Sequence, residues 1–398
     1  GLFVVPFILF MSLTGLPYLW QWEIEEVFHS KLALVTPSTD GQRASYETQL
    51  AAARSVFPDK PLLMVQTWPH RPDRSSRIQF GSMDDPYTVY VNPYTAEVLG
   101  SIHEQDRLSA WTISWHGGIP WGSAGSWIIE LFACWAIVLC VTGLMLWWPR
   151  AGWKIWGLWL PRLNLKGRML WRDLHAVTGA WIGVLAILFL ATGLPWTAFW
   201  GHTLFAKVQS WMGHETPHAV VWQNYYQSSP AEGRPPVSLD VVMQNATVMK
   251  LPGYLEVNLP NDARGVFKMQ NRTQFPSQSM HLQFDQYTGQ EIARASWEDK
   301  AWTNRTVDTG ISFHEGLLMG RFNQVLNTLI CLFFILLGLA AVAMWWKRKP
   351  MAAKSLPSLQ PIAMPLKAML VMAGLVMPLF GASLLAVLVI EWLRHPTT

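Results

Sequence analysis

The sequence predicts an α-helical membrane protein built from two repeats, each a helix, an extracytoplasmic α+β domain and a second helix, plus one extra C-terminal transmembrane helix. Three observations carry this prediction. Charged residues make up only 14% of the 398 residues, whereas ordinary globular chains carry about 25%. Five apolar runs reach or approach the roughly 20 residues that a membrane-spanning helix needs. The chain also matches itself at shifts of 178 to 198 residues, which indicates an internal repeat.

Composition also excludes several classes of protein. The formal net charge is only +4 and no Lys/Arg block is interleaved with polar sequence, which excludes a nucleic-acid partner. All three cysteines, Cys134, Cys140 and Cys331, lie inside apolar runs, so no disulfide framework is available to an exported domain. The 24 tryptophans against 9 tyrosines favour a membrane, because indole rings collect at the interface between lipid and water.

The first apolar run begins the chain, and it is not expected to be a cleaved signal peptide. No basic region precedes it and no small-residue cleavage site follows it. It begins abruptly in apolar sequence, so we expect that an upstream part is missing. The five predicted spans are Gly1 to Trp20, Trp127 to Trp148, Leu174 to Trp200, Val325 to Trp346 and Ala368 to Ile390.

Positive charges set the expected orientation, because short cytoplasmic connections carry an excess of Lys and Arg. Such residues crowd the connections after the second and fourth spans. The long connections then lie outside, in the periplasm of a Gram-negative bacterium. The predicted segments are span one 1–20, outer domain 21–125, span two 126–149, cytoplasmic loop 150–173, span three 174–200, outer domain 201–313, span four with its outer segment 314–346, cytoplasmic loop 347–367 and span five 368–391.

The repeat aligns short motifs in both halves. Thr14-Gly15-Leu16-Pro17 matches Thr192-Gly193-Leu194-Pro195, His116 matches His314, and Trp147-Trp148 matches Trp345-Trp346. Each outer domain is expected to hold a helix followed by strands. In the first domain these are a helix over about 45–55 and strands near 61–67, 77–80 and 87–91. In the second they are a helix from Ser238, its N-cap, to about 246, and strands near 254–259, 265–269 and 280–284.

His175 is the first candidate ligand, at the cytoplasmic end of span three. Gly179 lies four residues on and Gly183 eight, so all three share one helix face. This arrangement suits a flat haem macrocycle that is bound through His175 and lies against the helix backbone. The alternative is an interfacial histidine on a helix whose glycines serve close helix packing. At the shift of 178 residues, the counterpart of His175 falls at position −3, upstream of Gly1. The second ligand of the inner haem is predicted there.

His116 and His314 each stand eleven residues before an apolar run, on the outer side. A repeat-related pair at equal depth fits axial ligation of one haem iron from two sides. The alternative is an ordinary loop histidine, as expected for His70, His103 and His218. His202 maps onto Ile24 in the first half, so it is a weaker alternative for the outer haem.

Charged residues near these histidines are weaker candidates. Arg172 and Arg321 could pair with haem propionates, although such residues more often only anchor a span at the headgroups. Glu130 could tune a pKa or pair with Arg321, but an interfacial carboxylate is the simpler interpretation. No phosphate loop, dinucleotide fingerprint, His-Glu-x-x-His motif or Ser/His/Asp signature is present.

Taken together, these motifs resemble the PepSY-associated transmembrane family, and the likeness covers nearly the whole chain. It rests on the order and spacing of His116-Gly117-Gly118, Gly125 to Leu131, Thr142 to Arg150, Asp173-Leu174-His175 with Gly179, and Thr192 to Trp196. The chain is most similar to the bacterial inner-membrane ferric-siderophore reductases of the FoxB type. That resemblance implies PepSY-like outer domains, two b-type haems and reduction of iron in the periplasm.

We therefore expect a multi-pass protein of the bacterial inner membrane that acts as a ferric-chelate reductase. Electrons would come from a quinol or a cytoplasmic reductase, and a ferric siderophore would accept them outside. Reduction to Fe(II) weakens binding by hard oxygen ligands, so no catalytic acid or base is required. One alternative is a non-enzymatic membrane-anchored module for siderophore or peptide binding or transport. Another is a haem redox subunit that serves a different periplasmic acceptor.

Overall fold

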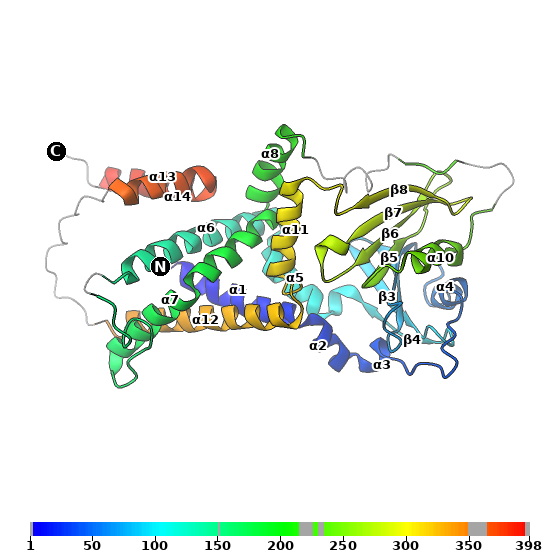
Figure 1. Ribbon diagram of the computed structural model, residues 1–398, viewed down its shortest axis with the longest axis horizontal. Helices are drawn as coiled ribbons and strands as arrows, with labels where there is room; N and C mark the ends of the chain where they lie inside the picture. Colours follow the sequence, from blue (N-terminus) through cyan, green and yellow to red (C-terminus); the bar gives the residue numbers. More distant parts are fainter. Residues whose placement is uncertain (1–2, 150–151, 215–225, 230–234, 349–363, 395–398) are drawn as a thin grey trace. The chain divides into compact units, whose positions relative to one another are not determined.

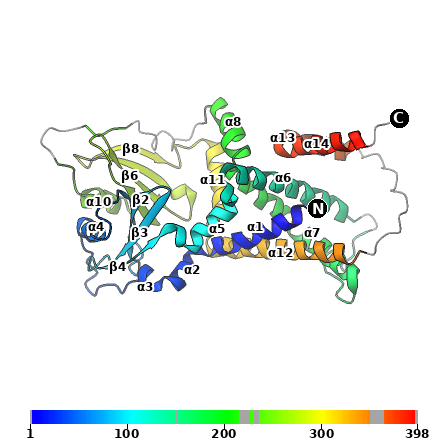
Figure 2. The ribbon, with the colours of Figure 1, turned by 180° about the vertical axis from the view of Figure 1, so that it is seen from behind.

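The computed structural model describes residues 3–149, 152–214, 226–229, 235–348 and 364–394. These residues form two compact units. The first unit, from Gly1–Leu16, Ile113–Val208 and Val325–Thr398, holds long apolar helices. The second, from Pro17–Thr112 and Gln209–Gln324, holds the β-sheet. Figure 1 and Figure 2 show the elements of both units from opposite sides.

Three helices in the described part of the chain are long and apolar enough to cross a membrane, as predicted for spans two, three and four. They cover Ile119–Trp147, Gly167–Trp196 and Arg321–Trp346. The first predicted span is instead a bent pair, α1 (Val4–Leu19) and α2 (Gln21–Phe28), whose axes meet at 61°. Within the three long spans, the continuous helices are α6 (Gly122–Trp147), α7 (Gly167–Gly193) and α12 (Arg321–Trp346).

The fifth span does not form the single helix predicted over 368–391. Two shorter helices, α13 (Met364–Val376) and α14 (Pro378–Arg394), lie side by side there (Figures 1 and 2). Pro378 cannot continue the preceding helix, because it lacks an N–H and its ring clashes with the previous turn. Close approach near the break needs glycine: a Cβ on Gly374 would lie 3.2 Å from Gly381 Cα. The prediction of one continuous helix is therefore wrong.

Contacts with the long helices hold this pair of short helices. Phe380 is fully buried and packs edge-on against Trp135 of α6, with ring centroids 4.8 Å apart. The indole N–H of Trp135 donates to Ser383 Oγ at 3.0 Å, and that of Trp200 donates to the carbonyl of Val376 at 2.9 Å. The two indoles thus bind the last residue of α13 and the second turn of α14, which fixes the break between these helices.

The second unit contains one eight-stranded antiparallel sheet in the order β4-β3-β2-β1-β5-β6-β7-β8. Each half of the chain supplies a four-stranded meander, and β1 joins β5 at the centre, where Val65 pairs with Val257. The two predicted outer domains therefore share one sheet. The strands are β1 Leu62–Thr67, β2 Ser76–Ser82, β3 Asp85–Val91, β4 Val98–His103, β5 Tyr254–Asn258, β6 Val266–Arg272, β7 Met280–Asp285 and β8 Glu291–Ser296.

Two helices, α4 (Tyr46–Arg54) and α10 (Leu239–Met249), cover one face of this sheet (Figure 1). Alternate strand residues such as Ile78 and Phe284 point into the apolar core beneath them. The two helices also cap each other. Asp240 accepts hydrogen bonds from the N–H groups of Tyr46 at 2.7 Å and Glu47 at 3.2 Å, and the Glu47 carboxylate accepts from Leu239 N at 2.7 Å.

This reciprocal arrangement corrects one detail of the sequence prediction. Ser238 does stand at the N-cap position of α10, but its side chain makes no capping hydrogen bond. Glu47, from the other half of the chain, takes that role.

Short helices connect the sheet with the long helices. In the first half α5 (Leu108–Gly117) and η2 (Ile119–Trp121) precede α6, and in the second half α11 (Trp302–His314) precedes α12. His116 and His314 thus lie at the last turns of corresponding helices. The remaining elements are α3 Ser30–Ala33, η1 Glu104–Asp106, η3 Leu194–Trp196, the π-helix η4 Trp200–Phe205, α8 Ala206–Trp211 and η5 Pro276–Gln278.

Candidate functional site

His116 is held in the helical unit by α1. Its Nδ1 lies 3.1 Å from Thr14 Oγ1. The Thr14 hydroxyl has a single hydrogen, which it donates within its own helix to the carbonyls of Phe10 at 3.0 Å and Met11 at 3.2 Å. The Thr14 hydroxyl and His116 Nδ1 therefore share a hydrogen bond, in which Thr14 can accept because its own hydrogen has carbonyl acceptors within α1. With Thr14 as the acceptor, Nδ1 carries the hydrogen and Nε2 carries the lone pair that an iron would need.

Gly15 makes room for this imidazole. A Cβ at position 15 would lie 3.0 Å from His116 Cε1 and 3.4 Å from Nδ1. Any larger residue would push the ring away from Thr14. The Thr14-Gly15 pair, which the repeat identified only as a motif, thus forms the support of the first candidate ligand.

His175 has a similar environment on α7. Its Nδ1 lies 3.1 Å from the carbonyl oxygen of Leu337 on α12. A carbonyl oxygen only accepts, so Nδ1 carries the hydrogen and Nε2 keeps its lone pair. Among the described residues, Nε2 has no hydrogen-bond partner. A backbone carbonyl on the far nitrogen is the usual second contact of a metal-bound imidazole.

The glycines that follow His175 serve two different contacts. A Cβ on Gly179 would meet only Leu337 Cδ2, at an ordinary distance of 3.7 Å. Gly183, in contrast, faces Leu144 of α6, whose side-chain atoms would lie 2.7 to 3.0 Å from an added Cβ. Gly183 therefore allows close packing of α7 against α6, and its position against a macrocycle stays a prediction. Gly179 remains compatible with either interpretation.

His314 is the last residue of α11 in the sheet-containing unit, and its ring is partly buried. Neighbouring groups fix the backbone around it. Asn323 Nδ2 donates to the carbonyl of Phe313 at 3.2 Å, and Tyr18 donates its hydroxyl to Glu315 at 2.8 Å. Burial raises the pKa of Glu315, although the hydrogen bond from Tyr18 acts in the opposite direction.

The predicted propionate partners have other surroundings. Arg321 pairs with the carboxylate of Glu23 and donates to Gln324 Oε1 at 2.7 Å. Arg172 is exposed on α7. The alternative ligand, His202, is exposed on the π-helix η4. The predicted mate of His175, together with Gly1, lies outside the described residues.

Glu130 has a role that the sequence did not reveal. It is fully buried in α6 rather than interfacial. Its Oε2 accepts hydrogen bonds from the N–H groups of Phe199 at 3.1 Å and Trp200 at 3.0 Å, which begin the π-helix after α7. Its Oε1 has no partner among the described residues. The carboxylate thus ties the segment that follows α7 to α6, and only its position inside an apolar run could have suggested a role.

In the described part of the chain, no three His, Cys, Asp or Glu side chains gather as a metal-ion site would require. Haem ligation sets a smaller requirement, because the porphyrin supplies four ligands and the protein only one or two axial ones. Imidazoles that are held through Nδ1, as those of His116 and His175 are, fit such axial ligation.

A family model described as the PepSY-associated TM region matches residues 1–348. No curated protein sequence matches the chain.

Proposed function

Because the chain belongs to the PepSY-associated TM family, we propose that it is a haem-containing transmembrane electron-transfer protein that reduces a ferric siderophore outside the cytoplasm. The family match covers most of the chain, and three helices are long and apolar enough to cross a membrane, which supports a membrane protein. The haem, the acceptor and the bacterial inner membrane with a periplasmic side are the proposed parts.

The hydrogen bond from His175 Nδ1 to Leu337 O is the observation that carries this proposal. It fixes the imidazole from the side opposite the metal-binding nitrogen, and His116 receives the same kind of support from Thr14. A histidine that served only as an interfacial anchor would need no fixed tautomer.

In the proposed protein, His175 would hold the inner b-type haem, with a second ligand upstream of Gly1. His116 and the repeat-related His314 would hold the outer one. Bound haem supplies a one-electron couple. The chain's own residues orient the ligands: Leu337 and Thr14 hold the imidazoles, and Gly15 leaves room for one of them. A quinol or a cytoplasmic reductase would supply the electrons.

The substrate side needs little protein chemistry. One electron converts the bound Fe(III) to Fe(II), which hard oxygen ligands hold less tightly, so the chelator releases iron intact. No proton transfer is needed in this step, which agrees with the absence of a predicted catalytic acid or base.

Dithionite difference spectra of the purified chain test the proposal. We expect b-type Soret and α bands that His175→Ala weakens, while His70→Ala leaves them unchanged, because the His70 ring is engaged by the carbonyl of Leu251. His116→Ala and His314→Ala should affect one common haem. A colourless protein after expression with haem supplied would refute the proposal and favour the non-enzymatic binding module.

A further inference from the structure

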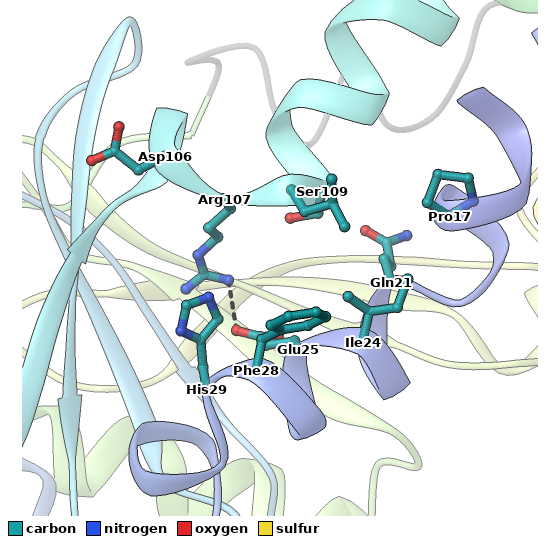
Figure 3. A pocket seen from close by; sticks show the side chains of 10 residues that line it. Pro17, Gln21, Ile24, Glu25, Phe28, His29, Asp106, Arg107 and Ser109 are labelled. Atoms are coloured by element: carbon teal, nitrogen blue, oxygen red, sulfur yellow. Dashed lines mark hydrogen bonds and ion pairs between the residues drawn. The ribbon is translucent and has the colours of Figure 1, made fainter. Parts of the chain in front are cut away.

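The sheet-containing unit has a pocket of about 230 Å³ beside the bend between α1 and α2. Helix α2 forms one wall, and the start of α5 forms the other (Figure 3). Pockets for drug-sized ligands measure about 300–1,000 Å³. This one therefore suits a single substituted ring and is too small for a whole siderophore complex.

Polar groups stand at the two ends of this pocket, with apolar side chains between them. His29 and the Arg107–Glu25 pair lie at one end, Gln21 lies at the other, and Ile24 and Phe28 lie between (Figure 3). Ser109 adds a hydroxyl from α5. Among the described residues, the side chains of His29 and Ser109 have no hydrogen-bond partner, so both are available to a ligand.

The charged side chains in the wall of the pocket are already paired with groups of opposite charge. Arg107 donates to Glu25 Oε1 at 2.9 Å and lies 3.1 Å from Glu104. Glu25 also accepts from Arg77 and from the hydroxyl of Tyr90. Because Arg107 is paired with two carboxylates, it offers no free charge to a phosphate. The pocket therefore favours an uncharged ligand with hydrogen-bonding oxygens.

The rim of the pocket is unusually apolar for a water-exposed surface. Phe28, which is 75% exposed, and Leu108, which is also exposed, both line the pocket. Helix α2 follows the apolar helix α1, and the two together have the length and composition of a bent membrane span. Exposed apolar side chains in such a position mark contact with lipid, so a molecule dissolved in the membrane could enter here.

We propose that this pocket binds the ring of a lipid-soluble para-quinone or its quinol. Such a ring carries two oxygens on opposite sides of a flat apolar body, which matches polar groups at two ends of an apolar floor. His29 contacts one oxygen, while Ser109, or Gln21 beside its hydrogen bond to Tyr18, contacts the other. This inference deepens the proposed function, which names a quinol or a cytoplasmic reductase as the electron donor, but binding at the pocket does not depend on haem.

Binding of decylubiquinone to the full chain in nanodiscs tests the site, with the dissociation constant measured by equilibrium dialysis. Ile24→Trp fills the pocket and should weaken binding at least tenfold. Val27→Trp places the same bulk on α2 outside the pocket and should leave binding unchanged. His29→Phe keeps the ring shape without its nitrogens and should also weaken binding. Equal affinities in the wild type, Ile24→Trp and His29→Phe would overturn the proposal, as would no binding at all.

A second titration separates a quinone from a phospholipid. Phosphatidylglycerol added to protein in zwitterionic nanodiscs should not displace decylubiquinone, and displacement that Ile24→Trp abolishes would show a lipid site instead. The outcome is distinct from that of the haem proposal. A colourless protein that still binds decylubiquinone through this pocket would retain the site and refute only the haem, whereas a haem-containing protein without such binding would do the reverse.

Discussion

Gly15→Ala should displace His116 and weaken its support. The added Cβ would lie 3.0 Å from His116 Cε1, while ordinary contacts begin at 3.4 Å, so the ring must shift by about 0.4 Å or more. The same shift would lengthen the 3.1 Å bond to Thr14 toward the limit of a hydrogen bond. Overpacking costs about 1–3 kcal/mol, and the weakened bond adds about 1 kcal/mol.

Thermal unfolding in detergent measures this loss, and reduced-haem spectra report on the ligand itself. Gly143→Ala is the matched control, because Gly143 lies in α6 and an added Cβ there meets nothing within 4 Å. That control should be neutral or stabilising by up to about 1 kcal/mol, from helix propensity. Thr14→Val, which removes the acceptor and keeps the shape, should reproduce part of the Gly15→Ala effect. If Gly15→Ala matched Gly143→Ala in both stability and spectrum, the support assigned to His116 would be wrong.

Three further predictions concern other contacts. Asp240→Ala removes the acceptor for two N–H groups of α4 and should cost about 1–2 kcal/mol of unfolding free energy, whereas the exposed Asp59→Ala should change it by less than about 0.5 kcal/mol; equal effects would contradict the capping. Glu130→Ala leaves two part-buried N–H groups without an acceptor and should lower stability by about 1–3 kcal/mol, while Glu130→Gln, which keeps an acceptor, should recover part of that loss in the same melting assay. Burial alone would raise the pKa of Asp285, but hydrogen bonds from the N–H groups of Ser229, Tyr287 and Thr288 lower it below its ordinary value. The ionised carboxylate therefore stabilises the fold above about pH 4, and this contribution is lost as the pH falls through the lowered pKa. A difference in stability between wild type and Asp285→Asn that did not narrow on acidification would refute this.

Much of the fold follows from patterns that one sequence contains. Apolar runs identified the long helices because lipid requires uninterrupted apolar helix. Alternating residues identified six strands, but β4 and β8 were missed. Both are edge strands of the sheet, and an edge strand needs less burial to be stable, so its alternation is weaker. The break before Pro378 was also missed, because the apolar run is continuous through it and hydropathy does not record a missing N–H.

For the candidate site too, local patterns in the sequence identified the residues, but only the structure gives their tertiary contacts. The sequence located His116, His175 and the Thr-Gly motifs, but a contact between residues 102 positions apart has no local signal. The internal repeat is the sequence feature that comes closest to such a signal. Thr192 donates to the carbonyl of Phe189 at 2.8 Å, as Thr14 donates to Met11 at 3.2 Å, so each threonine makes a hydrogen bond within its own helix. The recurring motif thus makes the same intrahelical hydrogen bond in both halves, and at Thr14 the hydroxyl also contacts an imidazole.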